Sequence, residues 1–280
     1  MARKFGGLWT REKLDILENY LKAYLKALKK QRFERWYIDA FAGDGSIQLA
    51  ESGEKDLFEE VSDLIHGSAR RALSLDPGFE RYLFIENDPS AAANLAKLRE
   101  EYPDKRIRVM EGDANVRLRE ICQSGNWTGR RAVLFLDPAG MQVGWETMEA
   151  VAATRAIDVW IWFPLGVGVN RLLVRSGEIN PAWEERLDRV FGTKDWRTAF
   201  YKRTHDLTLF GDEEHRVKTA TPKIIADYYN ERLKAIFPAV ASNPRMMRNA
   251  RNNPLYLLCF AAANPKGARI ALRIAQHLLK

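Results

Sequence analysis

Acidic residues recur in this sequence at the ends of short apolar runs. One run leads into Asp39 and a glycine-containing loop, and three later runs lead into Glu86, Asp113 and Asp137. If the runs are parallel strands of one sheet, their carboxyl ends meet at one edge, where such sheets bind ligands. Carboxylates at that edge would accept hydrogen bonds from hydroxyl and amino groups. The spacing therefore predicts one ligand site assembled from four strand ends.

The loop after the first run, residues 39–46, has the sequence DAFAGDGS. Gly43 and Gly45 carry no side chain, so the main chain can bend sharply there and approach a ligand closely. The loop has neither the GxGxxG spacing nor the Gly-Lys-Ser/Thr of a P-loop. It is therefore not predicted to cradle phosphates.

Two of the later strand ends suit the parts of a nucleoside. Glu86, which is followed by Asn87, would accept hydrogen bonds from the paired hydroxyls of a ribose. Asp113, between Gly112 and Ala114, would accept from an adenine amino group. Asp113 also suits the N-cap of the helix that follows, so both roles stay open.

The elements that would position these residues alternate along the chain. Apolar runs typical of buried strands cover residues 36–39, 82–86, 107–113, 132–137 and 159–163, and helical periodicity covers 91–101, 115–123 and 145–154. This alternation predicts an α/β fold with a doubly wound, mostly parallel sheet between two layers of helices. A further helix is expected at the start of the chain, with Thr10 as its N-cap.

The same patterns divide the chain into four parts. Residues 1–33 are expected to form an N-terminal helix that packs on the core, and residues 34–179 a Rossmann-like core. Residues 180–254 are rich in charge and helical periodicity, which predicts an inserted helical lobe or lid. Residues 255–280 are interpreted as a late strand and a closing helix that complete the core.

Composition excludes several classes of protein. The 280 residues are 46% hydrophobic, which excludes a disordered or fibrous chain. The formal charge of +7 permits a polyanionic partner without requiring one. Two cysteines and four histidines supply no disulfide framework and no metal-ligand set, and no apolar stretch is long enough to cross a membrane. We expect a cytoplasmic protein with no metal and no membrane partner.

The four strand ends together resemble the motifs of class I S-adenosylmethionine (SAM)-dependent methyltransferases over residues 34–165. The resemblance implies SAM as cofactor, on a Rossmann-like fold. The cofactor-binding residues that it implies are Asp39, Phe41, Ala42, Gly43, Gly45, Glu86, Asn87, Gly112, Asp113, Ala114 and Asp137, and the catalytic residues are Asp137 and Pro138.

A narrower resemblance extends over nearly the whole chain. The strings YIDAFAGDGS, DPAGMQVGWETMEA, FPLGVGVNRLL and PLYLLCFAAANPKGARIALRIAQ are similar to the three-Cys-motif partner proteins. That family is named for an accompanying cysteine-motif protein thought to resemble radical SAM enzymes. The resemblance implies such a protein as a partner and leaves the reaction undefined.

The fourth strand end departs from the methyltransferase pattern. In enzymes that methylate exocyclic amines of bases, this motif resembles Asp/Asn-Pro-Pro-aromatic, where the acid and a carbonyl hold the amine and the ring stacks on the flipped base. Asp137 and Pro138 match, and Pro138 fixes φ so that Asp137 is aimed above the sheet. Ala139 and Gly140 replace the second proline and the ring. The amine-binding half is kept, and no Pro-Cys follows that would attack carbon-5 of cytosine.

The positive charge and the partial amine motif favour a nucleic acid or modified base as methyl acceptor. Candidate substrate contacts are Asn170, Arg171, Arg245, Arg248 and Arg251. A turn at Asn170 and a solvated arginine-rich loop explain the same residues structurally. Two other functions stay open: a non-catalytic nucleotide-binding partner of a radical-SAM-like three-Cys-motif protein, and a dinucleotide-dependent oxidoreductase, which the glycine spacing disfavours.

Overall fold

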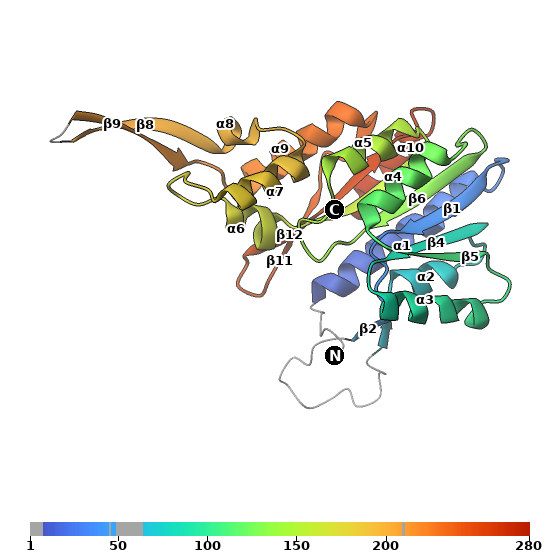
Figure 1. Ribbon diagram of the computed structural model, residues 1–280. Coiled ribbons are helices and arrows are strands. Elements are labelled where there is room, and N and C mark those ends of the chain that lie inside the picture. The colour runs from blue at the N-terminus through green and yellow to red at the C-terminus, as the bar shows by residue number, and fades with distance from the viewer. Residues whose placement is uncertain (1–7, 45, 49–63, 209–210) are drawn as a thin grey trace.

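A computed structural model of the protein describes residues 8–44, 46–48, 64–208 and 211–280. Its main sheet has the order β10-β12-β7-β6-β1-β4-β5, with β11 also paired to β12 (Figure 1). These strands are β1 (Glu34–Asp39), β4 (Arg81–Glu86), β5 (Ile107–Glu111), β6 (Arg130–Leu136), β7 (Ile157–Phe163), β10 (Ala239–Val240), β11 (Arg245–Arg248) and β12 (Pro254–Ala262). Two small sheets pair β2 (Ser46–Gln48) with β3 (Leu64–His66), and β8 (Tyr201–Thr208) with β9 (Gly211–Lys218).

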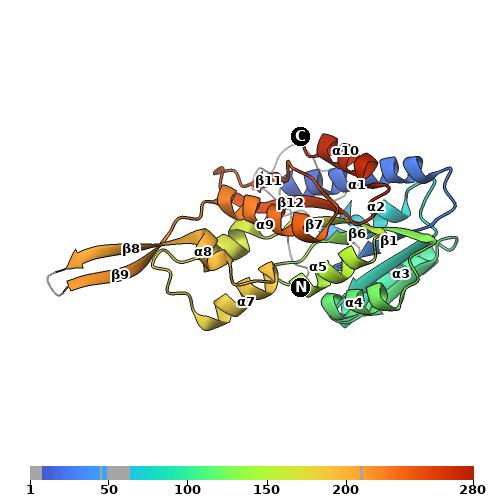
Figure 2. The same cartoon turned by 90° about the horizontal axis from the view of Figure 1, so that it is seen from above.

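Helices surround the main sheet. They are α1 (Leu8–Leu28), α2 (Ser68–Leu73), α3 (Pro89–Glu101), α4 (Ala114–Ser124), α5 (Trp145–Ala153), α6 (Asn170–Leu172), α7 (Pro181–Phe191), α8 (Trp196–Phe200), α9 (Pro222–Ile236) and α10 (Ala268–Leu278), with a π-helical turn η1 (Leu165–Val169). One core cluster joins the sheet to α1, α2, α3 and α10, and a second joins it to α4, α5, α7, α8 and α9. Figure 2 shows α1 and α10 on one side of the sheet and α5 and α7 on the other.

The order of the strands creates a switch point at β1. β1 pairs in parallel with β4 on one side and with β6 on the other, and β12 runs antiparallel to β7. The chain thus builds outward from β1 in both directions, which opens a crevice at the carboxyl ends of the strands. The predicted fold class, a doubly wound, mostly parallel sheet of the class I methyltransferase type, is confirmed.

Two local predictions are wrong. Thr10 lies within α1, which begins at Leu8, and its side chain is buried and does not cap the helix. Residues 180–254 are not a purely helical lobe, because they contain β8, β9, β10 and β11, and the last two belong to the main sheet. β8 and β9 were missed because they carry charged residues at successive positions and show no alternation of apolar and polar side chains.

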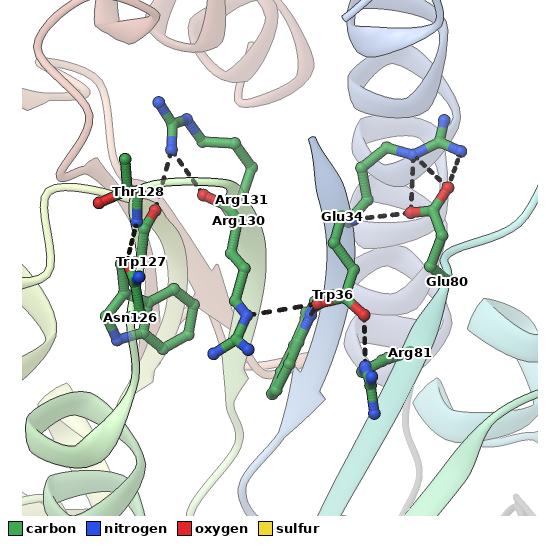
Figure 3. A network of polar contacts seen from close by, with 10 residues as sticks. Glu34, Trp36, Glu80, Arg81, Asn126, Trp127, Thr128, Arg130 and Arg131 are labelled. Atoms are coloured by element: carbon green, nitrogen blue, oxygen red, sulfur yellow. Dashed lines mark hydrogen bonds and ion pairs between the residues drawn. The ribbon is translucent and has the colours of Figure 1, made fainter. Parts of the chain in front are cut away.

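Charged side chains at the amino edge of the sheet pair with one another. Glu34 accepts a hydrogen bond from Arg81 (2.5 Å) and forms an ion pair with Arg130 (3.3 Å), which links β1 to both neighbouring strands (Figure 3). Arg35 and Glu80 form a second, forked pair nearby. Partly exposed pairs of this kind contribute little stability individually.

Helix α1 is attached to the sheet by a buried polar pair whose titration is testable. The Tyr20 hydroxyl donates to Asp158 Oδ2 at 2.7 Å, and burial raises the pKa of Asp158 to about 7. The native state therefore keeps a proton that the unfolded chain releases near pH 4, so this group costs stability as the pH rises from about 4 to about 7.

We expect Asp158→Asn to remove that cost. The free energy of unfolding of the variant, relative to wild type, should be higher at pH 8 than at pH 5, by up to about 2.7 kcal/mol, because about two of the three pKa units of the shift lie between pH 5 and pH 7. Urea unfolding at the two pH values measures the difference. An equal effect at both would show that Asp158 titrates normally in the folded protein.

Candidate functional site

The predicted strand ends lie at one edge of the sheet, which we call the carboxyl rim. Asp39 is the last residue of β1, in register with Phe84 of β4 and Phe135 of β6. Glu86 is two residues beyond Phe84, and Asp137 two residues beyond Phe135. Both therefore extend past the end of β1, on either side of the switch point.

Glu86 is linked to the glycine loop. Its Oε2 accepts a hydrogen bond from the Gly43 amide at 2.8 Å, and its Oε1 accepts one from the Asp88 amide at 2.9 Å. Gly43 has φ +61°, and a Cβ placed there would have no atom of the described residues within 4 Å. The loop therefore needs a residue that tolerates left-handed φ, and it faces open space beside the Glu86 carboxylate.

Asp39 lies beneath this loop and is fully buried. Its Oδ2 accepts hydrogen bonds from Tyr37 and from Ser68 at the start of α2. Burial raises the pKa of Asp39 to about 7, the Ser68 hydrogen bond opposes that rise, and the Asp137 charge adds to it. Oδ1 of Asp39 is buried with no hydrogen-bond partner among the described residues. An acceptor left in this state suits a donor supplied by a ligand.

The remaining cofactor-binding candidates lie around these two carboxylates. Gly112 has φ +129°, and its amide donates to the Glu86 carbonyl at 3.0 Å. Asp113 caps α4, with Oδ1 accepting from the amides of Asn115 and Val116. The capping role is thus confirmed, and it uses only one carboxylate oxygen. Phe41 is partly buried, Ala42 and Ala114 are buried, Asn87 is exposed, and Gly45 lies outside the described residues.

Asp137 contacts a residue that the sequence analysis missed. Lys13 Nζ of α1 donates to Asp137 Oδ2 at 2.5 Å, and the two side chains are 5% and 25% exposed. Lys13 also lies over the ring of Trp162 at 4.6 Å, a favourable cation–π distance. The sequence does contain one indication that Lys13 is buried. It precedes Leu17 by four residues and Tyr20 by seven, which places it on the apolar face of the helix.

Aromatic rings gather beside the Lys13–Asp137 pair. Trp162 stacks on Tyr256 with ring centroids 4.7 Å apart, and Trp9 of α1 contacts both. Trp162 and Tyr256 are buried, whereas Trp9 is only partly buried. Aromatic rings therefore lie near Asp137 in the folded protein, although no aromatic residue directly follows the Asp137-Pro138 pair in the sequence.

Asn115 connects the loops after β5 and β6, and it was also missed as a site residue. Its Oδ1 accepts from the Gly144 amide and from Thr147, and its Nδ2 donates to the Gln142 carbonyl. Gln142 in turn accepts from the Ala139 amide at 3.0 Å. These bonds hold the segment that follows Pro138 in one conformation.

Some of the predicted substrate-contact residues are already bonded within the protein, and others are exposed to solvent. Asn170 accepts from Lys218 Nζ at 2.8 Å, and Arg245 forms an ion pair with Glu12. Arg171, Arg248 and Arg251 are exposed. Arg245 and Arg248 belong to β11 and not to the loop that was expected.

Other kinds of site are not found in the described part of the chain. It has no group of three or more His, Cys, Asp or Glu side chains suited to a metal. A search of the same residues found no helix able to cross a bilayer. A surface cavity of about 1030 Å³ lies at the opposite, amino edge, between α4, α5 and the turn at Asn264, away from the carboxyl rim.

Comparisons with known proteins agree on the architecture. No family model and no curated protein matches the chain. Among solved structures, protein LPL1258 from Legionella pneumophila, of the family DUF519, has a TM-score of 0.51 at 12% identity, covering 95% of this chain and 91% of that one. A spermidine synthase in complex with the transition state analogue AdoDATO has a TM-score of 0.43 at 11% identity, covering 91% and 59%. The N-terminal domain of EvdMO1, determined with SAH and D-fucose, has a TM-score of 0.39 at 10% identity, covering 90% and 83%.

At these identities the likeness is one of fold. The likeness to protein LPL1258 covers nearly the whole chain, and the strand order with its antiparallel β12 describes the shared architecture on this side. The protein therefore has a doubly wound, mostly parallel α/β fold of the methyltransferase-like type.

Proposed function

We propose that the protein is a SAM-dependent methyltransferase whose acceptor is an amine of a nucleic acid or modified base. One observation carries this proposal: at the switch point, the Gly43 amide donates a hydrogen bond to the Glu86 carboxylate, and no described atom fills the space next to Gly43. That arrangement suits a ribose, with Glu86 as acceptor for its hydroxyls. Asp113 would accept from the adenine amino group through the oxygen that does not cap α4, and the buried Oδ1 of Asp39 would accept a further donor.

Bound SAM would supply an activated methyl carbon, so the protein mainly needs to align the acceptor and exclude water. Lys13 donates to Oδ2 of Asp137. Oδ1 is then left to accept a hydrogen bond from the acceptor amine and so to align it. Pro138 and the hydrogen bonds of Gln142 and Asn115 fix the backbone beside it. Trp9, the partly buried ring of the aromatic group, is the side chain best placed to stack on a base.

Labelled methyl transfer tests the proposal. The full chain is incubated with methyl-labelled SAM and separate RNA, DNA and protein fractions. We expect label in a nucleic-acid fraction, at a rate that Asp137→Ala lowers about 100-fold or more. Label in protein alone would reject the acceptor class, and no label in any fraction would reject the enzyme.

A second candidate function is a non-catalytic nucleotide-binding partner of a three-Cys-motif protein. The pairing of Asp137 with Lys13 favours it, because an acid already bonded within the protein can be purely structural. In that case SAM or a related nucleoside binds, no methyl group moves, and the chain co-purifies with the three-Cys-motif protein.

A substitution at Gly43 tests the cofactor loop. Asparagine tolerates left-handed φ, so Gly43→Asn should fold normally while its side chain enters the space assigned to the nucleoside. We expect SAM affinity in calorimetry to fall about tenfold or more, equivalent to about 1.4 kcal/mol. Gly129→Asn is a control for the added side chain, since no described atom lies near that glycine either and it is at the amino edge; unlike Gly43, it does not have a positive φ. Equal binding by both variants would remove the loop from the site.

A further inference from the structure

The positive charge of the chain is concentrated in residues 232–280. This segment contains nine Lys and Arg and no Asp or Glu. The whole chain has 44 basic and 37 acidic residues, so the part before this segment has a small excess of acids. The formal charge of +7 therefore comes from this segment alone. Four of its cations lie in or next to α10: Lys266, Arg269, Arg273 and Lys280.

These four side chains share the exposed side of α10. All four are exposed, whereas Ala268, Ala271 and Ala275 on the other side of the helix are buried. Arg269 and Arg273 are four residues apart, so their like charges repel each other across one helical turn. Arg269 also lies in the first turn, which contains no acid and is the positive end of the helix dipole. The helix itself therefore gains nothing from a cation at this position.

The basic end of α1 lies beside α10 on the same side of the sheet (Figure 2). α1 runs from Lys13 at the carboxyl rim to the amino edge, where β1 begins. β12 ends at Ala262, opposite Asp158 near the start of β7, so α10 also begins at the amino edge. Residues 19–33 contain no acid either. Together the two helices expose seven cations, which we call the basic face: Lys26, Lys29, Lys30, Lys266, Arg269, Arg273 and Lys280.

The charges of the basic face are not neutralised by the described part of the chain. None of the seven cations forms an ion pair with an acid there, whereas Lys22 of α1 pairs with Glu18 and Arg245 of β11 pairs with Glu12. Clustered cations without acidic partners create a positive potential that attracts polyanions. A bound polyanion would also relieve the repulsion between Arg269 and Arg273.

The composition of the face favours a nucleic-acid duplex over a membrane or a single strand. A helix that lies on a membrane inserts an apolar face, but those of α1 and α10 are buried in the core. Ile270, at 52% exposure, is the one exposed large apolar side chain on the described residues of either helix. Single strands are bound by stacking on aromatic rings, and Tyr20 and Tyr24 of α1 are buried. Cations alone suit the phosphates of a duplex.

We propose that the basic face binds the phosphate backbone of a nucleic-acid duplex, without reading its base sequence. From Arg269 to Lys280 the row of cations is about 16 Å long by the rise of a helix, which matches about five base pairs. The inference goes beyond the proposed function, because most of the face lies away from the carboxyl rim. Binding there requires neither SAM nor Asp137.

Fluorescence anisotropy with labelled DNA and RNA duplexes of about 20 base pairs tests the face. The full chain is titrated without SAM, at salt from about 50 mM to about 200 mM. We expect micromolar affinity at the lowest salt and a steep fall as salt rises. Arg269→Ala combined with Arg273→Ala should weaken binding about tenfold or more. It should also reduce the slope of log binding constant against log salt by about 2, since each phosphate contact contributes about 0.9.

Two further variants control for folding and for overall charge. Arg186→Ala combined with Lys194→Ala removes two exposed cations on and after α7, on the opposite side of the sheet, and should leave binding unchanged. Arg269→Lys combined with Arg273→Lys keeps both charges and should keep most of the affinity. Alanine and lysine both favour helices, so circular dichroism should show normal folding in every variant.

Several results would overturn the inference. They are no binding to either duplex at about 50 mM salt, equal losses in the α10 and α7 alanine variants, tighter binding to a single strand than to the duplex, and preferential binding to vesicles of anionic phospholipid. The outcome is separate from that of the proposed function. Duplex binding without methyl transfer rejects the enzyme and keeps the basic face, whereas methyl transfer without duplex binding does the reverse.

Discussion

Asp137→Ala is expected to lower the rate of methyl transfer about 100-fold or more, with a much smaller effect on SAM affinity. The variant removes the acceptor that would align the amine and abolishes the contact with Lys13 Nζ at 2.5 Å. Single-turnover transfer of labelled methyl measures the rate, and calorimetry measures the affinity. Asp137→Asn keeps one carbonyl oxygen for the amine and should retain more activity than the alanine variant.

Lys13→Met separates the role of the acid from that of its partner. Methionine keeps most of the length and the packing against Trp162 but loses the ammonium group. If Lys13 positions Asp137, the rate falls and the pH profile of transfer changes, whereas a purely structural lysine would lower only the melting temperature. Full activity in Asp137→Ala would assign this pair to stability and remove Asp137 from the catalytic machinery.

The second large effect is expected at Glu86. Glu86→Ala should weaken SAM binding about 100-fold, which corresponds to about 2.7 kcal/mol, or two charge-assisted hydrogen bonds to the ribose. The same change frees the amides of Gly43 and Asp88, which are accessible to water at the loop. We therefore expect the loss to appear in affinity and not in folding.

Glu111→Ala is the control for Glu86. Glu111 ends β5 directly beside Glu86 in the sheet, so the two substitutions remove the same group from adjacent strand ends. Glu111 is exposed and has no predicted contact with the nucleoside. Calorimetry should show normal SAM affinity for Glu111→Ala. Equal loss in both variants would point to the overall charge of the edge, and no loss in either would reject the ribose site.

The three-Cys-motif resemblance and the nucleic-acid acceptor remain proposals. Arg171 and Arg251 are exposed, and Arg248 is exposed while it donates to the Asn252 carbonyl; Asn170 and Arg245 are engaged within the protein.

The sequence by itself determined the parallel strands of the sheet, the late strand β12 and the positions of the acids. Strands buried on both faces, such as β6 and β7, need continuous apolar runs, and the residue that follows each run must lie at the rim. The Gly43 loop and the N-cap of α4 at Asp113 also depend on local rules, because φ and capping are set within a few residues.

Only the tertiary structure decided the partners of those residues. Lys13 reaches Asp137 across 124 positions of the chain, and no local pattern encodes a contact of that separation. β8 and β9 escaped detection because, beyond Tyr201 at the base of β8, none of their described side chains belongs to a core cluster, so no hydrophobic period marks them. Periodicity reports burial against the chain's own core. Periodicity therefore does not detect an exposed strand, or a charged side chain that is buried against a residue distant in sequence.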